Sequence, residues 1–285
     1  MQTNKITVIG AGVMGKGIAY ASSLAGFDTV IMDVDEKMVD KSYRDIKELF
    51  DKGVGRHKIS MTDRENALGR LEVSVSYEEA IKECDLVIEA VPEVAVIKRA
   101  VHEAVSEKAM SHTIFASNTS TMSPTEIASY GNRPENSIAM HFFNPVHRMP
   151  LVEIVRGLET SDATVTEVEA VAKKMGKETV VINEFPGFVT SRMSCLIGNE
   201  AFHMLQEGLG TPADIDKAVR FGLNHPMGPF ELVDLVGLDA RLNNMKELHS
   251  KLGERFRPAP LLEKYVNAGR LGKKSGRGVY DYSEC

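Results

Sequence analysis

The stretch Lys5–Gly15 reads KITVIGAGVMG, an apolar run that passes at once into three glycines with the spacing G-x-G-x-x-G. Small and apolar residues then recur at helical spacing until Gly26. A strand, a glycine loop and a helix in this order are the context in which the motif binds a dinucleotide. Gly10 permits the tight turn, Gly12 lets the backbone approach a pyrophosphate, and Gly15 lets the helix pack against the strand. The pyrophosphate would face the N-terminus of the helix.

The next apolar run, 28–32, ends in Asp33. A carboxylate at this place accepts hydrogen bonds from both ribose hydroxyls and repels a 2′-phosphate, so it favours NAD over NADP. Asp33 and Asp35 also precede a helical segment, and a helix cap is the structural alternative for Asp33. With the glycine loop in place, we interpret Asp33 as a cofactor residue.

Strand-like and helical patterns alternate through residues 71–75, 85–91, 113–116 and 137–141. This alternation predicts a doubly wound, mostly parallel sheet. From Pro186 onward no convincing strand follows before the last residues, and helical spacing takes over. We therefore expect an α/β, Rossmann-type NAD-binding domain over 1–185 and an all-helical substrate and dimerisation domain over 186–285.

A charged helical segment interrupts the alternation after residue 36. Gly53 and Gly55 are expected to end its first helix, and the capping box at 62–65 to begin a second one. The result is a helical hairpin inserted in the sheet domain. Its basic side chains would meet a phosphorylated substrate tail or would simply form a solvated face, and the candidates are Lys47, Lys52, Arg56 and Lys58.

The composition excludes several functions. With 34 Lys and Arg against 40 Asp and Glu, the net charge is −6, which argues against a general nucleic-acid binder. No apolar run is long enough for a membrane span, and no leader-like segment precedes the first strand. Together with an odd number of cysteines, this predicts a cytoplasmic protein.

No metal site is predicted. The three cysteines, Cys84, Cys195 and Cys285, have no pairwise metal-ligand spacing. Several histidines lie on charged helices or loops and are expected to be solvated, namely His57, His102, His112 and His249.

One histidine is different, because His141 ends an apolar strand-like run and a second such run follows a proline-interrupted turn. Adjacent strands would bring His141 to Glu153 in the second run. A carboxylate fixes the tautomer of an imidazole and stabilises its charged form, so the pair would act as a general acid and base. A satisfied core histidine and a solvated glutamate are the structural alternative. Upstream, 117–121 is either a simple connection or a set of hydrogen-bond donors.

These motifs together resemble those of the bacterial short-chain L-3-hydroxyacyl-CoA dehydrogenases, often called 3-hydroxybutyryl-CoA dehydrogenases. The likeness extends over essentially the whole chain. Each motif is modest alone, but their order makes the match specific. They are Gly10–Gly15 with Asp33, Asp85–Glu93, Ser117–Ser120, His141–Pro145, Pro186–Phe188, His225–Phe230 and Gly272–Gly278.

The resemblance implies interconversion of (S)-3-hydroxyacyl-CoA and 3-ketoacyl-CoA, of short chain length, by hydride transfer with NAD. It also implies an acyl-CoA cleft between the domains and a homodimer formed by the C-terminal domain. His141 would be the general acid and base, Glu153 its partner, Ser120 the donor to the substrate oxygen, and Asn144 a support of the same site. The cofactor positions would be Gly10, Gly12, Val13, Met14, Gly15, Asp33, Ala90, Glu93, Lys98 and Asn118, the last beside the nicotinamide.

The chain departs from the family pattern at two places. Ser191 stands where the family usually has an asparagine close to the reacting acyl group. Its hydroxyl donor is on a shorter side chain, so this substrate contact is either water-mediated or absent. The turn 147–150 reads HRMP, where PVMK is common. These changes bear on substrate choice and rate more than on the fold.

Two other functions remain open at this stage. A dehydrogenase of the same fold could act on a free 3-hydroxy acid, such as a sugar acid. A non-catalytic, cofactor-binding structural relative is the other possibility, and Ser191 is the feature that favours it. The joint presence of His141, Glu153 and Ser120 argues for turnover.

Overall fold

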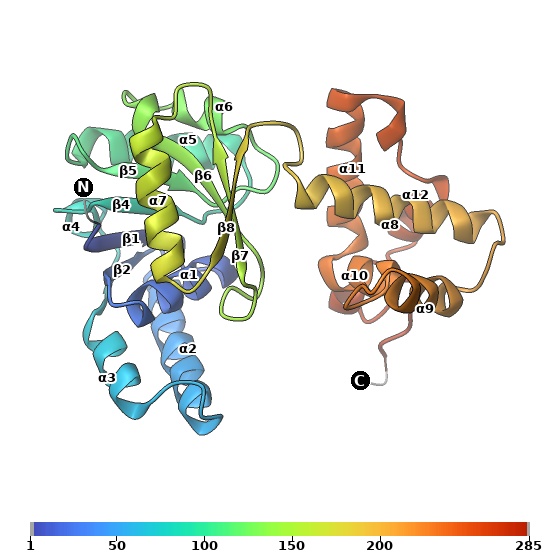
Figure 1. Cartoon of the computed structure of the whole chain (residues 1–285), viewed down its shortest axis with the longest axis horizontal. Helices are drawn as coiled ribbons and strands as arrows, with labels where there is room; N and C mark the ends of the chain where they lie inside the picture. Colours follow the sequence, from blue (N-terminus) through green and yellow to red (C-terminus); the bar gives the residue numbers. More distant parts are fainter. Residues whose placement is uncertain (1–2, 284–285) are drawn as a thin grey trace. The chain divides into compact units, whose positions relative to one another are not determined.

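The computed structural model describes residues 3–283, so Cys285 lies outside the described part. The chain divides into two compact units, Met1–Phe185 and Pro186–Cys285. The first is built around one sheet with helices on both faces, and the second is helical (Figure 1). The predicted fold class is confirmed.

Within the described residues, the first unit contains one eight-stranded sheet with the order β3-β2-β1-β4-β5-β6-β7-β8. All neighbouring strands are parallel except β6 and β7. The order reverses between β1 and β4, and such a switch point opens a crevice at the carboxyl ends of the strands. The strands are β1 (Lys5–Ile9), β2 (Asp28–Met32), β3 (Leu71–Ser74), β4 (Leu86–Glu89), β5 (Ile114–Ser117), β6 (Ser137–Phe142), β7 (Leu151–Arg156) and β8 (Glu178–Asn183).

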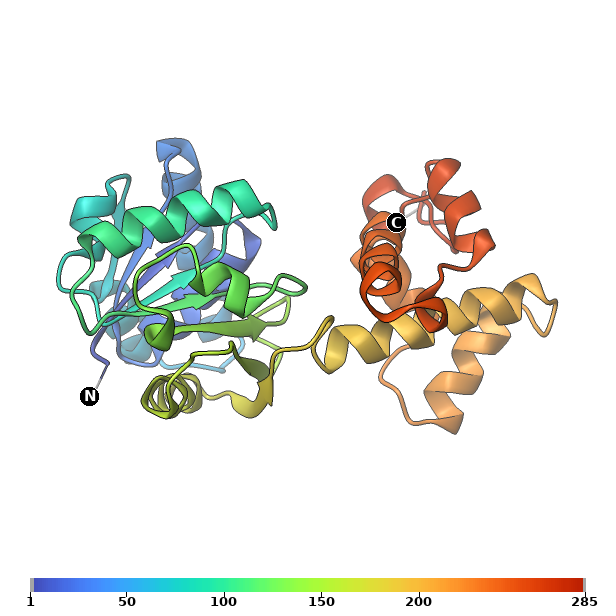
Figure 2. The same ribbon diagram turned by 90° about the horizontal axis from the view of Figure 1, so that it is seen from above.

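Helices cover both faces of this sheet, as Figure 2 shows for α5 and α7 on opposite sides. One face packs against α1 (Val13–Leu24), α2 (Glu36–Gly55), α3 (Met61–Gly69) and α7 (Asp162–Lys174). The other face packs against α4 (Tyr77–Ile81), α5 (Ala95–Lys108) and α6 (Pro124–Ala128). The near-continuous apolar strands of the sequence are therefore buried on two sides.

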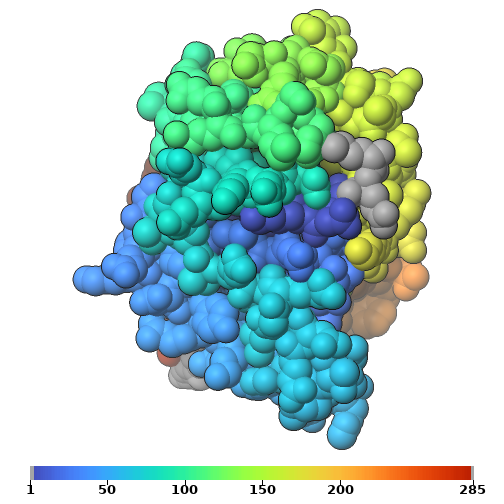
Figure 3. Space-filling view, turned by 90° about the vertical axis from the view of Figure 1, so that its left-hand side faces the viewer, coloured from blue at the N-terminus to red at the C-terminus, as the bar shows by residue number. Residues whose placement is uncertain are grey.

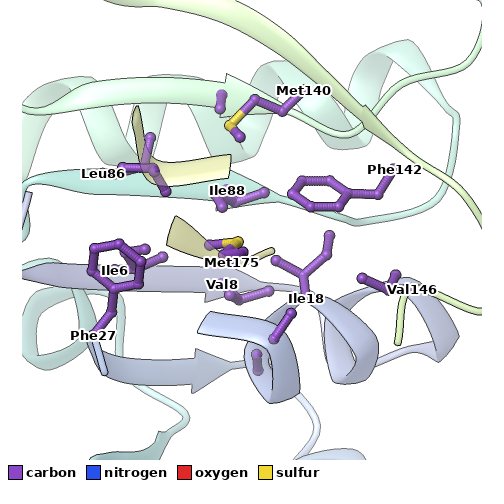
Figure 4. Close-up of a cluster of buried hydrophobic side chains, with 14 of the residues drawn as sticks. Ile6, Val8, Ile18, Phe27, Leu86, Ile88, Met140, Phe142, Val146 and Met175 are labelled. Carbon is purple, nitrogen blue, oxygen red and sulfur yellow. The ribbon is translucent and has the colours of Figure 1, made fainter. Parts of the chain in front are cut away.

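The larger core cluster brings α1 against the centre of the sheet. Figure 4 shows Ile18 of α1 among Val8 of β1, Ile88 of β4 and Phe142 of β6. Full burial of side chains of this size stabilises a fold by about 1.5–3 kcal/mol each. The same cluster includes Val146, which anchors the turn after β6 to α1.

The helical insertion agrees with its prediction at one boundary and differs at the other. Helix α2 continues through Gly53 and ends at Gly55, the second of the two glycines expected to end it. Its buried face, which includes Ile46 and Phe50, maintains the helix by packing. Helix α3 begins at Met61, and its capping box is formed by Ser60 and Asp63 rather than by residues 62–65. Figure 3 shows the α2–α3 segment projecting at the lower edge of this unit.

The second unit has its own core, in which the rings of Phe202 and Phe230 meet edge to face at 5.2 Å. Buried Asp234 accepts hydrogen bonds from the backbone of Val279 and Tyr280, which fastens the C-terminal segment to the unit. No helix of residues 3–283 is long and apolar enough to cross a membrane. The helices are α8 (Thr190–Gln206), α9 (Pro212–Gly222), α10 (Pro229–Val236), α11 (Leu238–Leu252) and α12 (Pro260–Asn267).

Candidate active site

His141 and Glu153 face each other across the antiparallel pair β6 and β7. The Nδ1 atom of His141 lies 2.7 Å from Oε2 of Glu153, and their exposed fractions are 6% and 0%. Because an ionised carboxylate only accepts hydrogen bonds, this contact places a proton on Nδ1 and leaves Nε2 as the basic atom. The ring of Phe143 lies 4.5 Å from the imidazole and helps to orient it. Glu153 is therefore not a solvated strand residue.

The other nitrogen of His141 faces Ser120, whose Oγ atom lies 3.1 Å from Nε2. Ser120 belongs to the loop that follows β5. The backbone N–H groups of Ser120 and Thr121 donate to Oε1 of Glu93, at 3.0 and 3.2 Å. The loop 117–121 is therefore a set of hydrogen-bond donors fixed by Glu93, and not a simple connection.

Glu93 is in turn held by a buried ion network that the sequence reasoning missed in part. Lys98 is fully buried, and its ammonium lies 2.9 Å from both oxygens of Glu89 and 3.2 Å from Oε2 of Glu93. Burial raises the pKa of Glu89, although Lys98 and Ser117 oppose this shift. Burial also acts to raise the pKa of Glu93, but Lys98 and the loop donors outweigh it and bring the pKa of Glu93 below its ordinary value. The sequence feature that could have identified Glu89 is its place as an acidic residue at the end of a buried strand.

The two predicted asparagines have different surroundings. The Oδ1 atom of Asn118 accepts the backbone N–H of Phe142 at 3.0 Å, so Asn118 ties the loop after β5 to β6. Asn144 is exposed and precedes a cis proline. It lines a cavity of about 340 Å³ together with Val13, Lys16 and other residues of α1 and α2.

A cavity of about 720 Å³ lies at the glycine loop, and its size and lining fit a dinucleotide. An added Cβ at Gly15 would lie 1.7 Å from the carbonyl oxygen of Gly10, so this glycine allows the close helix packing expected of it. At Gly12 the same atom would meet nothing within 4 Å, which leaves room for a pyrophosphate. Apolar side chains such as Met38 and Ile97 line this cavity. Of the predicted cofactor positions, this cavity is lined by Gly10, Gly12, Val13, Met14, Asp33 and Ala90.

Asp33 is half-buried and is not the cap of α2. The cap is Asp35, whose side chain accepts the backbone N–H of Lys37. Asp33 instead accepts the backbone N–H of Ala11 through Oδ2 at 2.8 Å, which fixes its carboxylate at the edge of the cofactor cavity. The helix-cap alternative for Asp33 is thereby excluded.

The prediction that His102 is solvated was wrong, since only 2% of the residue is exposed. Its ring packs at 4.1 Å from that of Phe115, and its two nitrogens face the hydroxyls of Ser106 and Ser137. Burial, together with the nearby charge of Arg133, lowers the pKa of His102 to about 4. Ser191 lies in the first turn of α8, in the second unit, where it is half-buried.

Comparison with known proteins agrees with this architecture. The model of the 3-hydroxyacyl-CoA dehydrogenase NAD binding domain matches residues 5–185, and the model of the 3-hydroxyacyl-CoA dehydrogenase C-terminal domain matches residues 187–282. The chain belongs to the 3-hydroxyacyl-CoA dehydrogenase family. The predicted resemblance, the predicted cofactor NAD and the predicted enzyme class, an NAD-dependent 3-hydroxyacyl-CoA dehydrogenase, are thereby confirmed.

Individual members of the family are similar over their whole length. The probable 3-hydroxybutyryl-CoA dehydrogenase of Bacillus subtilis is 45% identical over 100% of this chain and 99% of that protein. The 3-hydroxybutyryl-CoA dehydrogenase of Bradyrhizobium diazoefficiens is 40% identical over 98% of this chain and 95% of that protein. The crystal structure of (S)-3-hydroxybutyryl-CoA dehydrogenase PaaH1 from Ralstonia eutropha superposes with a TM-score of 0.96 at 40% identity, covering 99% of this chain and 100% of the other.

Proposed function

We propose that this family member interconverts (S)-3-hydroxybutyryl-CoA and acetoacetyl-CoA, with NAD as the hydride carrier. The observation that carries the proposal is the row Ser120, His141 and Glu153, in which two contacts of 3.1 and 2.7 Å align a hydroxyl, an imidazole and a carboxylate. The names and full-length similarity of the relatives support the short-chain substrate.

In the oxidative direction the 3-hydroxyl group of the substrate gives its proton to Nε2 of His141. Bound NAD supplies the acceptor for the hydride that leaves C3. Glu153 stabilises the imidazolium that forms, because its buried carboxylate lies against the Nδ1–H group. In reverse, protonated His141 and the Ser120 hydroxyl both donate to the 3-keto oxygen. Proton transfer by a positioned group is typically worth about 10²- to 10⁴-fold in rate.

A basic cavity of about 220 Å³ beside α2, lined by Lys52, Arg56 and Lys58, suits the phosphates of the CoA tail. Lys52 also lines the 340 Å³ cavity that contains Asn144, where Asp45 and Glu48 balance the basic side chains. Burial and the neighbouring cations lower the pKa of His147 in the 220 Å³ cavity, which reflects the local excess of positive charge. Lys47 lines neither cavity.

The assay that tests the function compares initial rates with acetoacetyl-CoA and with free 3-keto acids, each under NADH and then NADPH. We expect turnover with acetoacetyl-CoA and NADH, and His141→Gln should retain NADH binding while losing about 10²- to 10⁴-fold in kcat. His57→Gln, at an exposed site on the first unit, is the control. Preference for a free acid would replace the substrate assignment, preference for NADPH would overturn the role of Asp33, and near-normal turnover of His141→Gln would overturn the mechanism.

We also propose that the second unit forms a homodimer. Exposed apolar side chains on this unit support the proposal, since Leu209, Phe221 and Leu223 are 72%, 75% and 66% exposed. Large exposed apolar residues often mark association surfaces. Light scattering should give twice the chain mass of 31.3 kDa, and Phe221→Ser should shift the protein toward monomer. A monomeric wild-type protein at micromolar concentration would contradict the proposal.

A further inference from the structure

Glu89 is a fully buried carboxylate at the centre of the sheet. It is the last residue of β4, and β4 lies between β1 and β5. Its Oε1 atom accepts the backbone N–H of Val91 at 2.8 Å, and its Oε2 atom accepts the Ser117 hydroxyl at 2.6 Å. Lys98 donates to both oxygens at 2.9 Å. A buried charge is retained only with such partners, and these contacts restrict Glu89 to one position.

Lys98 connects this buried carboxylate to a second one. Its Nζ atom lies 3.2 Å from Oε2 of Glu93, whose side chain is 35% exposed. The other oxygen of Glu93, Oε1, accepts the backbone N–H of Ser120 and of Thr121 and the hydroxyl of Thr119. One oxygen of Glu93 is thus held by Lys98 and the other holds the loop.

The loop carries the hydroxyl that faces the proposed base, since Oγ of Ser120 lies 3.1 Å from Nε2 of His141. We infer that Glu89 is a positioning residue for the reaction: through Lys98 it fixes Glu93, and Glu93 fixes the Ser120 hydroxyl beside His141. This inference rests on the proposed function. Glu89 contacts Val91, Lys98 and Ser117, and it acts on Ser120 through Lys98 and Glu93.

The charge of Glu89 is what this arrangement requires. Two carboxylates share the single ammonium of Lys98, so its attraction is divided between Glu89 and Glu93. In Glu89→Gln the amide retains the size of the side chain, but its NH₂ group cannot accept from Lys98. The remaining amide oxygen is uncharged and attracts the ammonium less. Lys98 would then bind Glu93 more strongly and draw it from the loop, and the Ser120 hydroxyl would shift relative to His141.

The first test is hydrogen exchange, which does not depend on turnover. In Glu89→Gln the amides of Ser120 and Thr121 should exchange about tenfold faster than in the wild type. Glu72→Gln, an exposed carboxylate on β3, is the matched control and should leave the loop unchanged. Unchanged exchange of the loop in Glu89→Gln overturns the inference.

The second test is kinetic and separates positioning from general loss of structure. Glu89→Gln should lower kcat about 10²-fold, the size expected of a misplacement near 1 Å, with the NADH dissociation constant changed less than about threefold. Because Glu89 acts through Glu93, the double variant Glu89→Gln/Glu93→Gln should lose no more than Glu93→Gln alone. Independent, multiplying losses would show that Glu89 acts by another route and would overturn the inference.

Ser117→Ala is made in parallel, because it removes the hydrogen bond to Glu89 and the one from Lys98 and retains all the charges. In this variant the loop amides should exchange about fivefold faster and kcat should fall about fivefold. If Glu89→Gln does not fold, Ser117→Ala provides the test of the inference. Normal exchange and rate in Ser117→Ala would then count against the inference. Failure of the proposed function can be distinguished from failure of this inference. If the function is wrong, the wild-type protein does not turn over acetoacetyl-CoA, but hydrogen exchange of the loop still tests the role of Glu89.

Discussion

At the scale of single residues, a substitution at Gly12 should weaken cofactor binding without affecting folding. Gly12 is the N-cap residue of α1 with φ −72°, a value that any residue adopts, and an added Cβ would meet no atom within 4 Å. The free energy of unfolding of Gly12→Ala should therefore be nearly that of the wild type. The new methyl group would occupy the space left for the pyrophosphate, so the NADH dissociation constant should rise about tenfold or more.

Fluorescence titration of NADH and thermal unfolding measure the two effects. Gly55→Ala is the control, since Gly55 also has nothing within 4 Å of an added Cβ but lies outside the cofactor cavity. It should leave NADH binding unchanged. If Gly12→Ala binds NADH like the wild type, the cofactor does not approach the backbone at this glycine.

At this scale the sequence predicts contacts between neighbouring strands but not contacts that depend on tertiary packing. His141 and Glu153 were paired correctly, because two short alternating runs joined by a turn leave few registers. The link from Glu89 through Lys98 to Glu93 was missed, because it joins a strand end to a helix whose rotation is set by packing. His102 was assigned to solvent because its helix is charged overall, whereas the face that carries His102 is buried.

At the scale of elements, α1 contacts the turn that carries Asn144 through Gly17. An added Cβ at Gly17 would lie 2.8 Å from two side-chain atoms of Val146, a residue that is 2% exposed. Alanine normally stabilises a helix interior relative to glycine by about 0.5–1 kcal/mol. Here the clash should outweigh that gain, and Gly17→Ala should lower the free energy of unfolding by about 1–3 kcal/mol.

The double variant Gly17→Ala/Val146→Gly identifies the cause, because glycine at position 146 removes both clashing atoms, Cβ and Cγ2. Chemical denaturation of both single variants and the double variant should give a favourable coupling energy. Additive losses would mean that Val146 is not the obstacle. Turnover of Gly17→Ala should also fall, since the strained turn includes Asn144.

The elements themselves were predicted better than their ends. Alternating strands and helices, the antiparallel pair and the helical second unit follow from periodicity and caps. The start of α3 does not, since its capping box is formed by Ser60 and Asp63. Gly53 also fails to end α2, because packing of Ile46 and Phe50 maintains the helix as far as Gly55. Ser191 illustrates a further limit, because its role depends on a substrate contact that local sequence patterns do not encode.

At the scale of the whole molecule, the stability of the first unit should depend on pH through His102. Burial and Arg133 lower the folded-state pKa of His102 to about 4 from its ordinary value of 6.5. Protonation therefore favours the unfolded state, and the stabilising contribution is complete above pH 6.5 and is lost as the pH falls toward 4. Between pH 7 and pH 5 the loss should be about 2 kcal/mol.

Urea unfolding followed by circular dichroism at pH 7 and pH 5 measures this loss. His102→Gln does not titrate in this range and retains a polar group for Ser106 or Ser137, so its unfolding free energy should fall by about 2 kcal/mol less than that of the wild type. His57→Gln, at an exposed position, should respond to pH like the wild type. Equal pH responses of His102→Gln and the wild type would contradict this prediction, because they would mean that His102 has the same pKa in the folded and unfolded states.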